Sequence, residues 1–286
     1  MYQEQKEHIQ MKSKWKMILI PLIISAIVIA VIPGIFDLVF GLFLPSSEEI
    51  NTTPASAVSM IVTVILSGLL MCRVSKMSFE NLGWHKNGAI GEIVKGALGG
   101  FLSISVIAIV ALLLGGIKLE YVFSSSATFG IFSAFVFYMF QGTWEELVMR
   151  SYLMPNFAKV IGDRWAIIIT SVIFAALHGA NPNAQFLPIF NLFLFGLAFA
   201  IIYYKTGSLW ICGVGHGFWN FTMGHLYGAE VSGTMVKDSI FKSIPQSGKE
   251  FISGGLFGYE GSIITTVVGI ILIIGFLKLI QDKKRK

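Results

Sequence analysis

The sequence predicts an all-α membrane protein, a polytopic bundle of about eight transmembrane helices that forms one domain over residues 1–286. Hydrophobic residues make up 55% of the chain and the mean hydropathy is +0.74. Charged residues make up 13%, about half the share found in soluble proteins. The apolar runs are roughly 20 residues long, enough to cross a bilayer as helices. They are continuous, so they do not show the alternation of a membrane barrel.

The apolar runs define the expected helices in order. We expect spans at residues 17–44, 56–72, 93–117, 129–153, 165–180, 187–204, 209–227 and 262–280. Pro33 and Gly34 interrupt the first run and can kink it or end it early. The fifth run is short because His178, Gly179 and Pro182 close it.

Basic residues predict the orientation of these helices. With the N-terminus inside, seventeen of the 21 Lys and Arg residues fall in inner segments, and only Lys118, Lys237, Lys242 and Lys249 fall outside. This bias favours cytoplasmic termini in a multi-pass protein of a plasma membrane, and the composition favours a bacterial one. The positive-inside rule therefore explains the excess of basic residues behind the pI of about 9.1, and we expect no nucleic-acid partner.

Other features limit the architecture. The polar residues 1–16 are too long and mixed for a signal peptide, so we expect the first span to be retained as an anchor. Cys72 and Cys212 form no disulfide framework and no C-x-x-C metal pattern. Two G-x-x-x-G pairs, Gly96 with Gly100 and Gly213 with Gly217, indicate close helix packing.

The longest outer segment, residues 228–261, is expected to be an extracytoplasmic loop rich in Gly and Ser. Its amphipathic piece, residues 235–244, is expected to form an interfacial helix or a lid.

The fourth apolar run carries charges where hydrocarbon is expected. Glu146 and Arg150 are four residues apart, so they can pair on one helix face. Glu145 lies one residue round the helix and has no such partner in this interpretation. Charged groups at membrane depth are costly and mark functional sites. A carboxylate in a low dielectric beside a second acid is a candidate general acid or base, so Glu145 is the first candidate catalytic residue.

Two histidines lie in other apolar runs. His178 follows Phe174 by one helical turn, and His216 precedes Asn220 by one turn, so each pair shares a helix face. His216 and Asn220 could stabilise an oxyanion or supply half of a metal site. His225 is out of phase with His216 and is expected at the outer interface.

The remaining histidines, His8 and His85, are expected to be solvated. At about 1.5 Å per residue, the candidate residues lie between about 10 and 20 Å from the inner helix ends. We therefore expect one site near mid-membrane that opens inward.

These motifs resemble those of a known family. E-E-x-x-x-R at 145–150, F-x-x-x-H at 174–178 and H-x-x-x-N at 216–220 are similar to the motifs of the CPBP, or Abi, family. That family comprises type II CAAX prenyl endopeptidases and bacteriocin-processing or self-immunity membrane proteases. The resemblance covers residues 142–221 and implies a helical intramembrane endopeptidase.

The resemblance also implies residue roles. Glu145 would activate water, His178 would help to position it, and His216 and Asn220 would stabilise the oxyanion. Glu146 and Arg150 would be supporting neighbours. The family is described both as a metalloprotease and as a glutamate-dependent, metal-free enzyme. Without H-E-x-x-H we favour no cofactor, although Glu145, His178 and His216 could hold zinc.

The sequence thus predicts a catalytic core at about 129–227. The expected substrate is a small peptide precursor, a bacteriocin-type peptide or a lipidated protein terminus, met in the lipid bilayer. Two alternatives are a proton- or metal-coupled transporter and a non-catalytic immunity or regulatory membrane protein. The absence of an internal repeat and the place of Asn220 one turn from His216 favour the protease.

Overall fold

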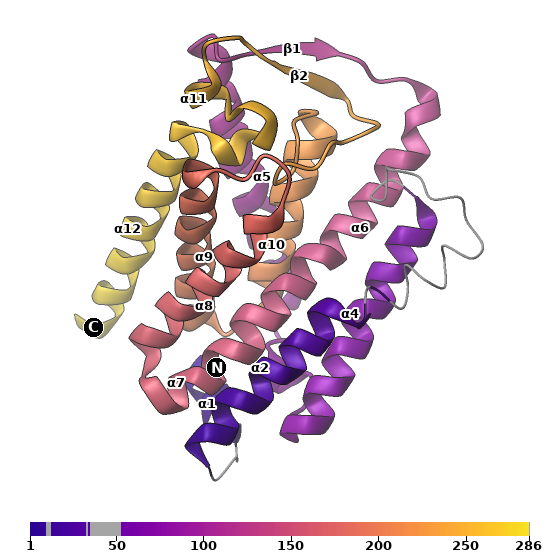
Figure 1. Ribbon diagram of the computed structural model, residues 1–286. Coiled ribbons are helices and arrows are strands. Elements are labelled where there is room, and N and C mark those ends of the chain that lie inside the picture. The colour runs from indigo at the N-terminus through magenta and orange to yellow at the C-terminus, as the bar shows by residue number, and fades with distance from the viewer. Residues whose placement is uncertain (10–12, 33, 35–52, 286) are drawn as a thin grey trace.

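The computed structural model describes residues 1–9, 13–32, 34 and 53–285, and this part of the chain is mostly helical (Figure 1). The first half of the chain supplies α1 (Tyr2–His8), α2 (Lys14–Ala30), α4 (Pro54–Ser75), α5 (Ala89–Leu113) and α6 (Thr128–Glu146). The second half supplies α7 (Met154–Ile161), α8 (Asp163–Leu177), α9 (Phe186–Thr206), α10 (Leu209–Phe221), α11 (Glu250–Ser253) and α12 (Ile263–Arg285).

Four of the described helical stretches are long and apolar enough to cross a membrane: Pro54–Ser75, Ala89–Leu113, Asp163–Ala180 and Phe186–Thr206. Their length and composition indicate a multi-pass membrane protein. The count of eight spans stays a prediction. Part of the first expected span, residues 35–44 with Pro33, lies outside the described residues.

Local sequence signals set the helix ends. Thr53 caps α4 by accepting a hydrogen bond from the Ser56 amide at 3.2 Å, and Pro54 occupies the first helical position. Ser208 caps α10 in the same way, with the Ile211 amide as donor at 3.2 Å. Each cap satisfies an amide that the helix itself leaves unpaired.

Glycines bring α10 against its neighbours α5 and α6. A Cβ added to Gly96 would lie 2.6 Å from the Ile211 carbonyl oxygen, and one added to Gly100 would lie 2.1 Å from the Gly215 carbonyl oxygen. On the other face, a Cβ on Gly217 would lie 2.7 Å from the Tyr138 carbonyl oxygen. The close packing predicted from the two G-x-x-x-G pairs is therefore confirmed.

The all-α prediction is wrong in one place. Strand β1 (Ile117–Tyr121) pairs antiparallel with β2 (Phe241–Pro245), from Ile117 opposite Pro245 to Tyr121 opposite Phe241. The interfacial helix expected at 235–244 does not form, because the backbone from Phe241 onward bonds to this distant strand. Apolar spacing within one segment does not reveal such a partner.

The strand pair marks one end of the bundle, here called the ribbon end. Helix α1 lies toward the opposite end, and the C-terminal end of α12 points the same way (Figure 1). Lys118 and Lys242, two of the four bases assigned outside, belong to the strands. The orientation of the bundle in a membrane stays a prediction.

Helix α1 was not expected from the polar N-terminal segment. Tyr2 and Gln5 are buried, and the Gln5 side-chain amide donates to the Gly207 carbonyl at 2.9 Å. Lys6 pairs with Asp163 at 2.8 Å. These contacts hold α1 against the beginning of α8 and the end of α9.

The glycine packing can be tested with matched substitutions. Gly100→Ala should lower the free energy of unfolding by about 1–3 kcal/mol, because its Cβ would meet backbone atoms. Gly91→Ala, on the same helix, meets nothing within 4 Å and should be neutral or stabilising by up to about 1 kcal/mol. Denaturation of both purified variants in detergent measures the difference, and equal stabilities would contradict the packing account.

Candidate active site

A cavity of about 460 Å³ lies among α6, α8, α10 and the segment 228–261. Its walls include all four residues predicted to be catalytic, namely Glu145, His178, His216 and Asn220. They come from three helices and are up to 75 residues apart in the chain. The structure therefore brings them together, and their chemical roles stay predictions.

Glu145 lies between the two histidines. Its Oε2 atom is 3.8 Å from His178 Nε2 and 3.8 Å from His216 Nε2. Both separations are longer than a hydrogen bond. Within the described residues Oε2 is buried and accepts no hydrogen bond, so it is an available proton acceptor that faces two ring nitrogens.

The other ring nitrogen of each histidine is held by an oxygen. His178 Nδ1 lies 2.8 Å from the Phe174 carbonyl oxygen, and His216 Nδ1 lies 3.0 Å from Glu146 Oε1. Because both oxygens accept, each Nδ1 carries the proton, and Nε2 is the atom left to face Glu145. In the F-x-x-x-H motif it is therefore the backbone carbonyl of Phe174 that orients His178.

Glu146 and Arg150 form the pair that their spacing predicted. Arg150 Nε lies 3.2 Å from Glu146 Oε2, and both side chains are fully buried. Arg150 Nη2 donates to the Gly196 carbonyl at 3.1 Å, and the guanidinium lies 4.5 Å from the centre of the Phe174 ring. The pair therefore connects α6 with α8 and α9, while Glu146 also holds His216.

The chain between Glu145 and Arg150 leaves the α-helical path. Residues Leu147–Leu153 form a π-helical segment, and all seven side chains are buried. A π-helical turn carries an extra residue and is frequent at functional sites. The segment contains Arg150, and the chain continues from it directly into α7.

Gln141 is a site residue that the sequence reasoning missed. Its amide nitrogen donates to Glu145 Oε1, and its amide oxygen accepts from Asn220 Nδ2 at 2.8 Å. Glu145 therefore has a partner on its own helix, contrary to expectation. The available signal was a polar amide in an apolar run, four residues before Glu145.

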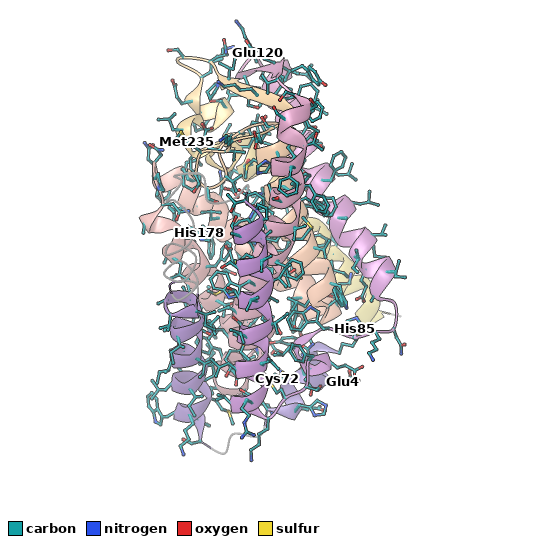
Figure 2. The ribbon with its side chains drawn as sticks, turned by 90° about the vertical axis from the view of Figure 1, so that its right-hand side faces the viewer. Glu4, Cys72, His85, Glu120, His178 and Met235 are labelled. Carbon is teal, nitrogen blue, oxygen red and sulfur yellow. The ribbon has the colours of Figure 1, made fainter. Side chains whose placement is uncertain are left out.

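The cavity extends toward the ribbon end. Ser232, Thr234, Met235 and Glu260 line it, and Met235 lies between His178 and Glu120 along the bundle (Figure 2). Val148 and Met149 of the π-helical segment line it as well. Residues 228–261 fold onto the helices and form part of the wall, and the inward opening expected from the sequence stays a prediction.

Glu260 anchors this segment over the cavity. Its carboxylate accepts hydrogen bonds from Trp219 Nε1 at 3.0 Å and from the Ser232 amide and hydroxyl at 3.0 and 2.7 Å. Asn181 donates to the Ser232 carbonyl at 3.0 Å, and Asn191 to the Glu260 carbonyl at 2.7 Å. The cover is therefore tied to α9, to α10 and to the turn after α8.

The expectation for one further histidine, His85, is wrong. His225 is fully buried, with its Nδ1 2.7 Å from the Asp238 carbonyl oxygen, and its expected place at the outer interface stays a prediction. His85 is buried instead of solvated, and its Nε2 lies 2.6 Å from Glu92. Both find partners in segments that are distant in the chain or separated by a turn. His8 is exposed, as expected.

The arrangement of Glu145, His178 and His216 bears on the alternative zinc site. Among the described residues, no group of three or more His, Cys, Asp or Glu side chains is arranged to hold a metal ion. Glu145, His178 and His216 therefore do not form such a group as they lie, and Glu145 Oε1 is already bonded to Gln141.

A comparison with protein families gives one match. Residues 127–222 match the model described as type II CAAX prenyl endopeptidase Rce1-like. The chain carries a domain of this family. The Rce1-like domain runs from just before α6 to the end of α10, so it contains every site residue named in the sequence analysis. The predicted resemblance is confirmed, whereas helices α1 to α5 and residues 228–261 lie outside the match. No curated protein matches the chain.

The buried ion pair of the Rce1-like domain generates a stability prediction. Glu146→Gln should destabilise the protein by about 3–5 kcal/mol, because it leaves the Arg150 charge buried without a counter-charge. The double variant Glu146→Gln/Arg150→Met should recover part of that loss. Chemical denaturation in detergent measures both effects.

The matched control is Glu120→Gln, an exposed carboxylate on β1, which should change stability by no more than about 0.5 kcal/mol. If Glu146→Gln proves as stable as Glu120→Gln, the buried pair does not have the structural importance assigned to it.

Proposed function

We propose that this protein is an intramembrane endopeptidase in which Glu145 activates a water molecule for attack on a peptide bond. The observation that carries the proposal is the position of Glu145 Oε2, 3.8 Å from both His178 Nε2 and His216 Nε2 in a cavity. Such a gap suits a water molecule bonded to all three atoms. The Rce1-like domain supports protease activity over transport.

The reaction follows from general base catalysis. Glu145 takes a proton from water while the water oxygen forms a bond to the carbonyl carbon, and the carbonyl π electrons move onto its oxygen. The tetrahedral intermediate then collapses as the C–N bond breaks. Glu145 returns the proton to the leaving nitrogen, so the products are a carboxylic acid and an amine.

The histidines have different surroundings and therefore different proposed roles. His178 donates through Nδ1 to a neutral carbonyl, so its Nε2 is an acceptor that helps to position water. His216 donates through Nδ1 to an anionic group, the Glu146 carboxylate. Protonated Nε2 can donate to the oxyanion, with Asn220 Nδ2 as the second donor.

We further propose that the chemistry needs no bound metal. Glu145 is held by Gln141 through Oε1, which leaves Oε2 as the single free carboxylate oxygen for proton transfer. A residue that orients the base in this way suits general base catalysis, in which one oxygen must point at the water.

The substrate proposal follows from the cavity. A small peptide precursor, a bacteriocin-type peptide or a lipidated protein terminus would enter from the membrane or from the ribbon end, where residues 228–261 form part of the wall. Residues 129–227 would be the catalytic core of one membrane domain in a bacterial plasma membrane, with both termini cytoplasmic.

Replacing the base tests the function. Glu145→Gln should reduce peptide cleavage by about 10²–10⁴-fold, because the amide cannot accept the proton. Purified wild-type and variant protein would be incubated with leader, bacteriocin-type and prenylated C-terminal peptides, and products measured by mass spectrometry. Glu120→Gln serves as the control. Unchanged processing by a folded Glu145→Gln variant would exclude this role, and ion-dependent flux in proteoliposomes would favour a transporter.

A chelator arm of the same assay tests metal dependence. Activity should persist in excess EDTA and 1,10-phenanthroline. Loss on chelation with recovery on adding zinc would overturn the metal-free proposal and leave the protease assignment intact.

The hydrogen bonds that join Asn220 to Gln141 and Gln141 to Glu145 give a separate kinetic prediction. Asn220→Ala should lower kcat by about 10²–10³-fold with little change in KM, as expected for a donor that acts on the oxyanion. Gln141→Leu should also lower kcat, because it frees both Glu145 and Asn220, whereas Gln141→Glu is a poor substitute that places a like charge beside Glu145. Equal losses in binding and turnover would contradict these roles.

A further inference from the structure

A second cavity, of about 340 Å³, lies on the other side of α10 from the candidate active site. Helices α5, α9, α10 and α12 form its walls, with Gly99, Phe195, Phe199, Trp219, Leu272 and Phe276 among its lining residues. The lining is apolar except at one end and at scattered hydroxyl groups. Such a cavity suits a hydrocarbon chain.

The polar end of this cavity is basic. Lys95 lies in the second turn of α5 and Lys205 in the last turn of α9, and both line the cavity. In the described part of the chain neither ammonium group has an ion pair, and no carboxylate lines the cavity. Glu92, one turn before Lys95, is bonded to His85 and Ser208. Two positive charges therefore lie unneutralised at the mouth of an apolar groove.

We propose that this cavity binds one anionic phospholipid, with an acyl chain between α5, α9 and α12 and the phosphate between Lys95 and Lys205. From Lys95 to Ser103 the groove follows α5 for about 12 Å at roughly 1.5 Å per residue, which accommodates a large part of an acyl chain. Both lysines lie at the end that the positive-inside rule assigns to the cytoplasmic leaflet, where anionic headgroups are attracted to basic residues.

Three glycines of α5 distinguish the groove from the helix contact beside it. A Cβ on Gly96 or Gly100 would collide with the α10 backbone, whereas one on Gly99 meets nothing within 4 Å. Gly99 is therefore not needed for helix contact. A large side chain there would occupy the groove and leave the α5–α10 packing unchanged.

The cavity is also connected to the candidate active site. The Phe199 ring stacks on His216, with ring centres 5.4 Å apart and an angle of 19°, and Trp219 donates to Glu260. A lipid in the groove would contact both aromatic residues. If the proposed function holds, lipid binding should also affect turnover, but the binding proposal does not depend on it.

The experiment uses the full-length protein in detergent, with lipid retention measured by native mass spectrometry and affinity by titration. Dioleoyl phosphatidylglycerol should bind at least tenfold more tightly than dioleoyl phosphatidylcholine. Gly99→Leu should abolish this binding, and Lys95→Gln/Lys205→Gln should weaken it by roughly tenfold or more and remove the preference for the anionic lipid.

Matched controls separate the site from general effects. Gly91→Leu adds the same side chain to open space on the same helix outside the cavity. Lys86→Gln/Lys159→Gln removes two exposed charges that line neither cavity. Both controls should bind phosphatidylglycerol like the wild type.

Three outcomes would overturn the proposal. The first is equal binding of the two lipids, which would indicate a neutral apolar occupant. The second is equal loss of binding in the control variants. The third is full competition by inorganic phosphate, which would show that the lysines bind a free anion. Should Gly99→Leu fail to fold, the lysine variant and the lipid comparison decide the question.

Discussion

The site depends on the two contacts that the Glu146 carboxylate makes, one with Arg150 and one with His216. One oxygen pairs with Arg150 and the other bonds to His216, and both acid and base are fully buried. A buried charge is tolerated only when its partners are close and well placed. Moving α10 away from α6 would therefore break the bond to His216 and leave a carboxylate poorly compensated. The buried charge of Glu146, which is costly in α6, thus also helps to fix the position of His216.

Small residues make that geometry possible. Glycines on both faces of α10 allow the α5 and α6 backbones to approach within distances that a Cβ would not permit. Because α10 is narrow, a single helix separates the candidate active site from the apolar cavity on its other side, and Phe199 and Trp219 contact both regions.

The segment 228–261 completes the site from outside the Rce1-like domain. Glu260 receives hydrogen bonds from α10 and from Ser232, which fixes the cover over the cavity. The family match defines the helices that hold the polar groups. Part of the cavity wall, namely Val231, Ser232, Thr234, Met235 and Glu260, lies beyond the match.

The sequence by itself determined features that depend on neighbours along one helix. Apolar runs predicted the helices, and the spacing of Glu146 and Arg150 predicted their pairing, because residues four apart on a helix share a face. The place of Gln141 four residues before Glu145 carried the same kind of signal. Tertiary structure alone decided the pairing of β1 with β2, the burial of His85 and His225, the bond from Glu146 to His216, and the extension of the cavity toward the ribbon end. Each of these joins segments separated by turns or by whole helices, and helical periodicity carries no information about which distant backbone or side chain will fill a given space.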